Sequence, residues 1–245
     1  MCSSIKSLHF KGLESIGNCA FQECTSLESV VFDGDGPLIL GPGAFADCFN
    51  LKTIVFNTNL TNIYHVVFRN CGFTEIEIPS SIKSIGGNAF MGSKLTRINF
   101  LGFSSLKVLV ANVFQGATHL TDINLPETIQ EINENAFEST NISSFVVPKQ
   151  TISITEYAFR NCKRLENFII PENCSLQKLG YFLFEGCLSL KKFECNGSDY
   201  FEVENFALFN KSKTSLICFP PACECQYFYV PTTLREISGA AFYCC

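Results

Sequence analysis

The sequence predicts an α/β solenoid, in which about ten coils of 22–25 residues stack with a parallel β-sheet on one face and short helical turns elsewhere. Two observations predict it. A small or aliphatic residue followed by Phe recurs along the chain, and the first seven steps between these Phe residues are 24, 23, 22, 24, 23, 22 and 25 residues. Two further apolar columns stand five and eight residues before these Phe residues. The recurring Phe residues are Phe21, Phe45, Phe68, Phe90, Phe114, Phe137, Phe159, Phe184, Phe209 and Phe242.

The predicted sheet comes from a short string in each coil whose apolar residues alternate. In residues 120–125 the apolar positions are Leu120, Ile123 and Leu125. Alternation turns one face of a strand inward and the other toward solvent. A proline then follows the strand in several coils, where its missing N–H ends the ladder without harming it. These prolines are Pro79, Pro126, Pro148, Pro171 and Pro231.

The helical turns are expected around each Phe, where the spacing of apolar residues widens, as at Asn88-Ala89-Phe90. A coil of this size cannot bury its own apolar side, whereas stacked coils can. The recurring Phe residues from Phe21 to Phe242 are therefore predicted to form an aromatic spine inside the rod. Large apolar residues at a fixed period are usually core, which favours a spine over a ligand pocket.

The pattern breaks once, between Phe209 and Phe242, where the step is 33 residues. We expect a single solenoid domain over residues 1–245 with an insert at about 217–226. Neither end of the sequence shows a polar capping element, although an isolated array normally needs one. The chain is therefore expected to be a segment of a longer protein or to associate through its ends, including end-to-end association with itself.

Charge and hydropathy exclude several function classes. The formal net charge is -5, and neither sign gathers into runs, so the basic clusters that nucleic acids and anionic membranes require are missing. No run of about 18 apolar residues occurs, so this segment is not expected to insert into a membrane. No secretion signal is visible, which leaves a surface or secreted location and a cytoplasmic one both open.

Fourteen cysteines are many for this length. Six stand three residues after a recurring Phe and are interpreted as buried free thiols, since cysteine behaves as a small hydrophobic residue. Cys218, Cys223 and Cys225 cluster in the expected insert, where a local disulfide or a zinc site is conceivable. Their spacing fits no paired Cys-x2-Cys pattern, so no metal or cofactor is predicted. The six recurring cysteines are Cys24, Cys48, Cys71, Cys162, Cys187 and Cys245.

A catalytic set is not visible in the sequence. His9, His65 and His119 fall in different coils at different repeat positions, so no nucleophile, base and orienting partner come together. We therefore predict that the chain is not an enzyme.

The candidate functional positions are the outward side chains of the strands, because residues between the buried ones face solvent. Such a surface on a rigid array is predicted to bind another protein. Exposed Val and Ile in it are either partner contacts or residues with good strand propensity. One outward column contributes Val31, Val55, Glu77, Asn99, Asn124, Val146, Ile169 and Glu194, and its neighbour contributes Arg97 and Asp122.

The full repeat reads Leu-x-x-Ile-x-Ile-Pro-x-x-Leu-x-x-Ile-Gly-x-x-Ala-Phe-x-x-Cys, and residues 76–90 carry most of it. This order resembles the BspA-like leucine-rich repeat, found in bacterial surface antigens and in protist protein families. The resemblance implies a leucine-rich-repeat solenoid and adhesion to a host or matrix protein; an intracellular protein-interaction scaffold of the same fold is the alternative. Four coils depart from the pattern, since the cysteine slot holds Ser93, Ala117, Thr140 and Ser212.

Overall fold

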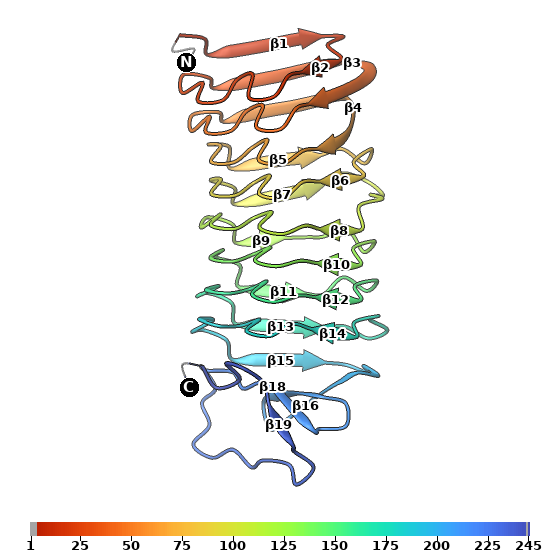
Figure 1. Ribbon diagram of the computed structural model, residues 1–245, viewed down its shortest axis with the longest axis vertical. Helices are drawn as coiled ribbons and strands as arrows, with labels where there is room; N and C mark the ends of the chain where they lie inside the picture. Colours follow the sequence, from red (N-terminus) through yellow and green to blue (C-terminus); the bar gives the residue numbers. More distant parts are fainter. Residues whose placement is uncertain (1–3, 244) are drawn as a thin grey trace.

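The computed structural model describes residues 4–243 and residue 245, and it confirms the leucine-rich-repeat solenoid. The chain winds into a rod whose coils follow one another in sequence order from β1 to β15 (Figure 1). The first sheet face is formed by the strands with alternating apolar residues that the sequence predicts. Its strands are β1 (Ser7–Lys11), β3 (Ser29–Leu40), β4 (Thr53–Ile63), β5 (Glu75–Ile78), β7 (Arg97–Phe100), β9 (Asp122–Ile123), β11 (Ser144–Val146), β13 (Asn167–Ile170) and β15 (Lys192–Cys195).

A second sheet face is built from two-residue strands. It contains β2 (Ser15–Ile16), β6 (Ser84–Ile85), β8 (Val108–Leu109), β10 (Glu131–Ile132), β12 (Ser153–Ile154) and β14 (Lys178–Leu179). The long strands β3 and β4 turn the corner and contribute to both faces. Proline accounts for the end of β5, because Pro79 follows it directly and its carbonyl accepts the N–H of Ile82 at 3.1 Å, whereas no proline directly follows Phe32 or Phe56.

All ladders between neighbouring coils are parallel, but they are not continuous. On the first face the described residues form ladders β1-β3-β4, β5-β7-β9 and β11-β13-β15, so pairing stops between β4 and β5 and again between β9 and β11. On the second face it stops between β6 and β8. The interruptions of the two faces fall between different pairs of coils. Where β4 and β5 are unpaired on the first face, β4 pairs with β6 on the second, and where β9 and β11 are unpaired, β10 pairs with β12.

The prediction of helical turns is wrong. No helix occurs among the described residues; the segments around the recurring Phe are series of tight turns. Two residues per coil, four positions apart, have left-handed backbone angles, for example Asn88 (φ 57°) with Gly92 (φ 65°) and Asn112 (φ 60°) with Gly116 (φ 69°). A right-handed helix cannot continue through a left-handed residue, and Asn and Gly tolerate that conformation best.

The core is the predicted aromatic spine as far as Phe184. Successive rings stack at centroid distances of 5.3–6.1 Å from Phe21 to Phe184. The six from Phe45 to Phe159 are fully buried. Cysteines of the repeat slot lie beside them, and five of these six are buried: Cys24, Cys48, Cys71, Cys162 and Cys187.

The C-terminal part departs from the parallel stack. Strands β16 (Phe201–Glu204), β17 (Ala207–Asn210) and β18 (Ser215–Cys218) form an antiparallel sheet, to which β19 (Glu236–Ile237) adds in parallel. Phe209 lies in β17 and packs in a second apolar cluster with Phe219, so it does not continue the spine. Phe219 instead makes the bond of a spine residue, donating its N–H to Ala241 as Phe45 does to Val67. We therefore propose that the length added to the repeat lies in the β16–β17 hairpin rather than at 217–226.

Candidate functional site

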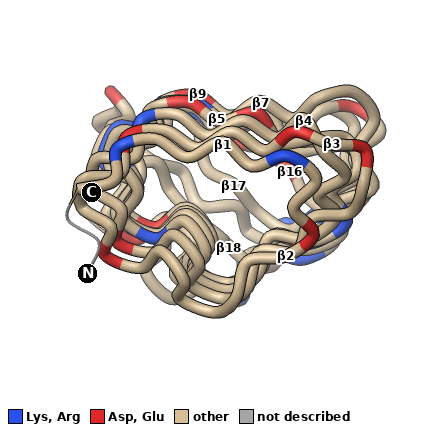
Figure 2. The backbone as a smooth tube through the Cα atoms, turned by 90° about the horizontal axis from the view of Figure 1, so that it is seen from above, with Lys and Arg blue, Asp and Glu red and all other residues tan. Residues whose placement is uncertain are grey.

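The predicted outward positions all lie on the outside of the first sheet face, and none of them is buried. Seen along the rod, β1, β4, β5, β7 and β9 share one long side, with acidic positions near β4, β7 and β9 (Figure 2). Register pairing places Val31 beside Val55, Glu77 beside Asn99, and Arg97 beside Asp122. Farther along, Val146, Ile169 and Glu194 are neighbours, and Asn124 is exposed directly after β9.

The two interruptions of the first face divide these positions into three groups. Val31 and Val55 lie before the first gap, and Val146, Ile169 and Glu194 lie after the second. The middle group holds the other five. The structure therefore does not bring the ten positions into one uniform surface. The shape of the surface at the two gaps determines where a partner side chain can insert.

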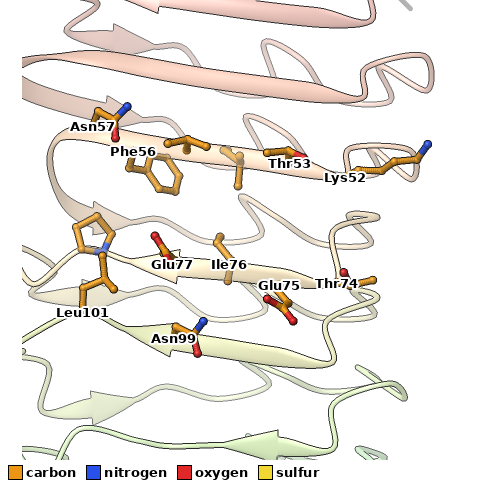
Figure 3. A pocket seen from close by; sticks show the side chains of 13 residues that line it. Lys52, Thr53, Phe56, Asn57, Thr74, Glu75, Ile76, Glu77, Asn99 and Leu101 are labelled. Atoms are coloured by element: carbon orange, nitrogen blue, oxygen red, sulfur yellow. The ribbon is translucent and has the colours of Figure 1, made fainter.

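A groove of about 400 Å³ opens at the first gap, between β4 and β5. Its lining includes Val55, Glu77 and Asn99 from the predicted column, with Glu75, Thr53 and Lys52 beside them. Figure 3 shows Thr53 on β4, both glutamates on β5 and Asn99 on β7, with Lys52 directly before β4. Because the strands are not paired here, inward residues also reach the groove: Ile54 and the half-buried Phe56 from β4, and Ile76 from β5.

The groove combines an apolar floor with an acidic rim. Glu75 and Glu77 are exposed, and neither forms an ion pair within the described part of the chain. Lys52 is the basic residue of the lining. Its Nζ lies 3.7 Å from the carboxylate of Glu28 in the preceding coil, and this carboxylate partly neutralises the positive charge of Lys52. Elsewhere on the face charges are paired, Arg97 with Asp122 at 3.8 Å and Lys192 with Glu194 at 2.8 Å.

The sequence reasoning missed part of this site. Glu75 stands in the same predicted outward column as Arg97 and Asp122, whereas the two residues that follow β7 were not predicted. Leu101 lines the groove and is 43% exposed, and Phe103, two residues later, is fully exposed. The available signal was their position, because a Leu and a Phe stand outside the buried columns in a coil that lacks the strand-ending proline.

A second hollow of about 270 Å³ lies at the other gap. Its lining is polar throughout: Thr121, Asn141, Ser143, Arg164, Glu166 and Ser189. None of the predicted positions contributes to it. Without an apolar floor it offers a partner only hydrogen bonds, which replace hydrogen bonds to water. The groove between β4 and β5 is therefore the stronger candidate.

The histidines occupy exposed places. His9 contacts the carboxylate of Asp33, whose other oxygen accepts a hydrogen bond from Asn57 at 2.8 Å. The Asn57 bond and then the His9 bond hold the pKa of Asp33 below its ordinary value. Among the described residues no group of three or more His, Cys, Asp or Glu side chains is arranged to hold a metal ion. Nor does any described segment form a helix able to cross a membrane.

Comparisons with known proteins agree with this architecture. A leucine-rich repeat protein from Eubacterium ventriosum superposes with a TM-score of 0.54 and 18% identity, covering 98% of this chain and 51% of its own. One from Bacteroides ovatus gives a TM-score of 0.51 and 19% identity, covering 97% and 73%. At these identities the likeness shows the fold alone, and this chain spans only about half of the first protein. No curated protein matches the sequence.

The family is shown by a sequence model. The model described as a BspA type leucine rich repeat region, in six copies, matches residues 1–36, 38–151 and 131–245. Repeat arrays of this kind generally serve protein interactions, and their fold is typically non-catalytic. The chain belongs to the BspA type leucine-rich-repeat family.

Proposed function

We propose that this chain is a protein-binding module that recognises its partner on the first sheet face, with the groove between β4 and β5 as the centre of contact. The observation that carries the proposal is the apolar floor of Ile54, Phe56 and Ile76, which is reached from the outside of the first sheet face through this groove. Protein interfaces are most stable where an anchor side chain fills such a hollow and a polar rim excludes water.

The chemistry of the groove specifies the kind of anchor. Glu75 and Glu77 place two carboxylates at its rim, and neither has an ion-pair partner in residues 4–243. A partner that presents Lys or Arg next to an apolar side chain would satisfy the carboxylates and fill the floor together. Leu101, which follows β7 and is 43% exposed, adds apolar surface to the lining of the groove.

The biological setting that we propose is adhesion to a host or matrix protein. Membership of the BspA type family supports it, and so does the long rigid face, which can meet an extended surface. Surface labelling of intact cells followed by mass spectrometry tests the setting. If the protein is labelled only after lysis, adhesion is excluded and an intracellular scaffold of the same fold takes its place.

The groove itself is tested with a displayed peptide library. We expect selected peptides to carry a basic residue beside an aromatic or aliphatic one, and we expect binding to be lost in the double variant Glu75→Lys, Glu77→Lys. Reversing two charges in a contact centre typically weakens binding by several kcal/mol. The same double variant should unfold at the wild-type urea midpoint, since both side chains are exposed.

A matched control is available on the opposite side. Glu131 and Glu156 are also exposed carboxylates, on and beside the second sheet face. Glu131→Lys with Glu156→Lys makes the same change in net charge away from the groove. If this control loses as much binding as the groove variant, the effect is one of overall charge and the groove is not the site.

A further inference from the structure

The segment between β18 and β19 holds two cysteines in contact with each other. The thiol of Cys223 donates to the sulfur of Cys225, with 2.6 Å between the two Sγ atoms. Both residues are half-buried, and only Glu224 separates them in sequence. No other sulfur–sulfur hydrogen bond is found among the described cysteines.

The backbone on either side of the pair is anchored. The N–H of Phe219 donates to Ala241 at 2.7 Å, and that of Ala222 donates to Leu190 at 3.0 Å. After the pair, the ring of Phe228 packs on Phe219 with 4.8 Å between centroids. Because the segment is fixed before and after the two cysteines, their thiols stay close and do not depend on a rare excursion of the chain.

Cys223 is also accessible, unlike the five buried cysteines of the repeat slot. Cys223 lines a surface hollow of about 330 Å³ together with Lys191, Phe206, Ala222 and Glu224. In contrast, Cys162 and Cys187 are buried and donate to backbone carbonyls at 3.0 and 3.1 Å. A small thiol reagent can therefore reach the hollow while the thiols of the core stay shielded.

We propose that Cys223 and Cys225 form a thiol–disulfide exchange site, which reacts with small-molecule disulfides and closes into an intramolecular disulfide. Burial and the neighbouring thiol raise the pKa of Cys223 to about 11, which keeps its proton in place. Either thiol of the pair can attack the reagent first, and the other then resolves the mixed disulfide.

The exchange balances in two steps. One thiol of the pair loses its proton, its sulfur attacks one sulfur of the reagent disulfide, and the reagent S–S bond breaks to release one thiolate, which takes up a proton. The second thiol of the pair then loses its proton and attacks the protein sulfur of the mixed disulfide, releasing the second reagent thiolate, which is also protonated. Two protein thiols are oxidised, and one small disulfide is reduced to two thiols.

Closure affects two prominent aromatic side chains. Tyr227 and Tyr229 follow the pair directly and are 78% and 77% exposed. Asn205 of the β16–β17 turn donates to the carbonyl of Tyr229 at 3.4 Å. A disulfide across Cys223 and Cys225 restricts the backbone that enters this aromatic stretch, so oxidation fixes how the tyrosines are presented.

The test is a redox titration of the full chain in mixtures of reduced and oxidised glutathione, followed by rapid alkylation and tryptic digestion. One tryptic peptide, residues 214–235, contains Cys218, Cys223 and Cys225. We expect this peptide to become two hydrogen atoms lighter and to retain one alkylatable thiol, at Cys218. Oxidation should follow a two-electron dependence on the glutathione ratio and disappear in both Cys223→Ser and Cys225→Ser.

Two other cysteines supply the control. Cys174 and Cys195 are also half-buried, but each donates to a backbone carbonyl instead of a second sulfur. They should stay reduced, or form only mixed disulfides with glutathione, at ratios that close the pair. The proposal is overturned if residues 214–235 keep three alkylatable thiols in oxidised glutathione, or if the bond found joins Cys218 to another cysteine.

Limited digestion by chymotrypsin checks the consequence for the tyrosines. Cleavage after Tyr227 and Tyr229 should be severalfold slower in the oxidised chain than in the reduced one. Cys225→Ser should be cleaved at the same rate with and without oxidised glutathione. Equal cleavage of the oxidised and reduced wild-type chain would contradict the inferred restriction.

Discussion

The thiol of Cys71 donates a hydrogen bond to the backbone carbonyl oxygen of Phe45, 3.2 Å away in the preceding coil. The same bond joins Cys48 to Phe21 at 3.0 Å and Cys162 to Phe137 at 3.0 Å. The slot cysteine therefore fastens each coil to the spine residue of its neighbour, which explains why a thiol recurs where a plain hydrophobic residue would also be buried.

We predict that Cys71→Ala lowers the free energy of unfolding by about 1–3 kcal/mol, because it leaves a small void and leaves the Phe45 carbonyl with one hydrogen bond, from the N–H of Cys48, instead of two. Urea denaturation followed by circular dichroism measures the change. Cys19→Ala is the matched control, since Cys19 is exposed and its sulfur lies 3.8 Å from the nearest carbonyl acceptor. Equal losses in the two variants would show that the buried thiol bond is unimportant.

The buried thiols also predict how stability depends on pH. Burial raises the pKa of Cys48 and of Cys162 from the ordinary 9.0 to about 12. Above pH 9 the unfolded chain releases these protons while the folded chain keeps them, so unfolding becomes easier as pH rises toward 12. The stabilisation is complete below pH 9. We expect the urea midpoint to fall above that pH, and to fall less steeply in Cys48→Ala with Cys162→Ala.

Removing one ring from the spine should be far more damaging than removing an exposed one. Phe114 is fully buried and stacks at 5.6 Å on both Phe90 and Phe137. Phe114→Ala is expected to lower the free energy of unfolding by about 3–5 kcal/mol. Phe103→Ala is the control, with an expected change within about 0.5 kcal/mol because Phe103 is fully exposed.

The interrupted array should also unfold in parts. Coils contact mainly their neighbours, so the loss of Phe114 weakens the middle of the array more than its ends. Calorimetry of Phe114→Ala is expected to show a broader or divided transition. A single sharp transition at the wild-type temperature would contradict the role given to the spine.

One natural residue is predicted to be suboptimal. Val66 has a left-handed backbone (φ 52°) at the position that Asn occupies in Asn88, Asn112 and Asn135. A β-branched residue is strained there, so Val66→Asn should stabilise the protein by about 1 kcal/mol. Val110→Asn is the control, because Val110 lies outside the left-handed positions. Thermal unfolding of both variants decides, and stabilisation by Val110→Asn as well would refute the backbone explanation.

The coil period, the spine and the outward columns could be predicted from the sequence, because apolar residues at a fixed period have only the shared interior to occupy. The turns could have been predicted too. Asn88 and Gly92, or Asn112 and Gly116, are the residues that favour left-handed angles, yet the apolar spacing alone was taken as helical. The alignment on Phe209 failed because the Leu-Phe dipeptide also fits a buried strand, which is where β17 places it.

The groove could not be predicted, because it depends on where neighbouring strands lose their pairing. Val31, Val55, Glu77 and Asn99 read as one even column in the sequence. The separation of β4 from β5 results from how the long strand β4 turns its corner against a coil whose strand ends at Pro79. This loss of strand pairing depends on two neighbouring coils together, and the sequence of either coil alone does not predict it.

The gaps in strand pairing also affect how the rod can bend. Where β4 and β5 are unpaired, the ladder from Asn62 and Ile63 to Ser84 and Ile85 still joins the same two coils on the opposite face. That ladder can serve as a hinge, and a bend about it that widens the groove must also stretch the backbone bonds from Phe68 to Ala89 and from Lys94 to Cys71 in the turns of the same two coils. A partner that wedges into the groove would thus curve the whole rod, and pulling on the rod's ends would alter how tightly the groove grips.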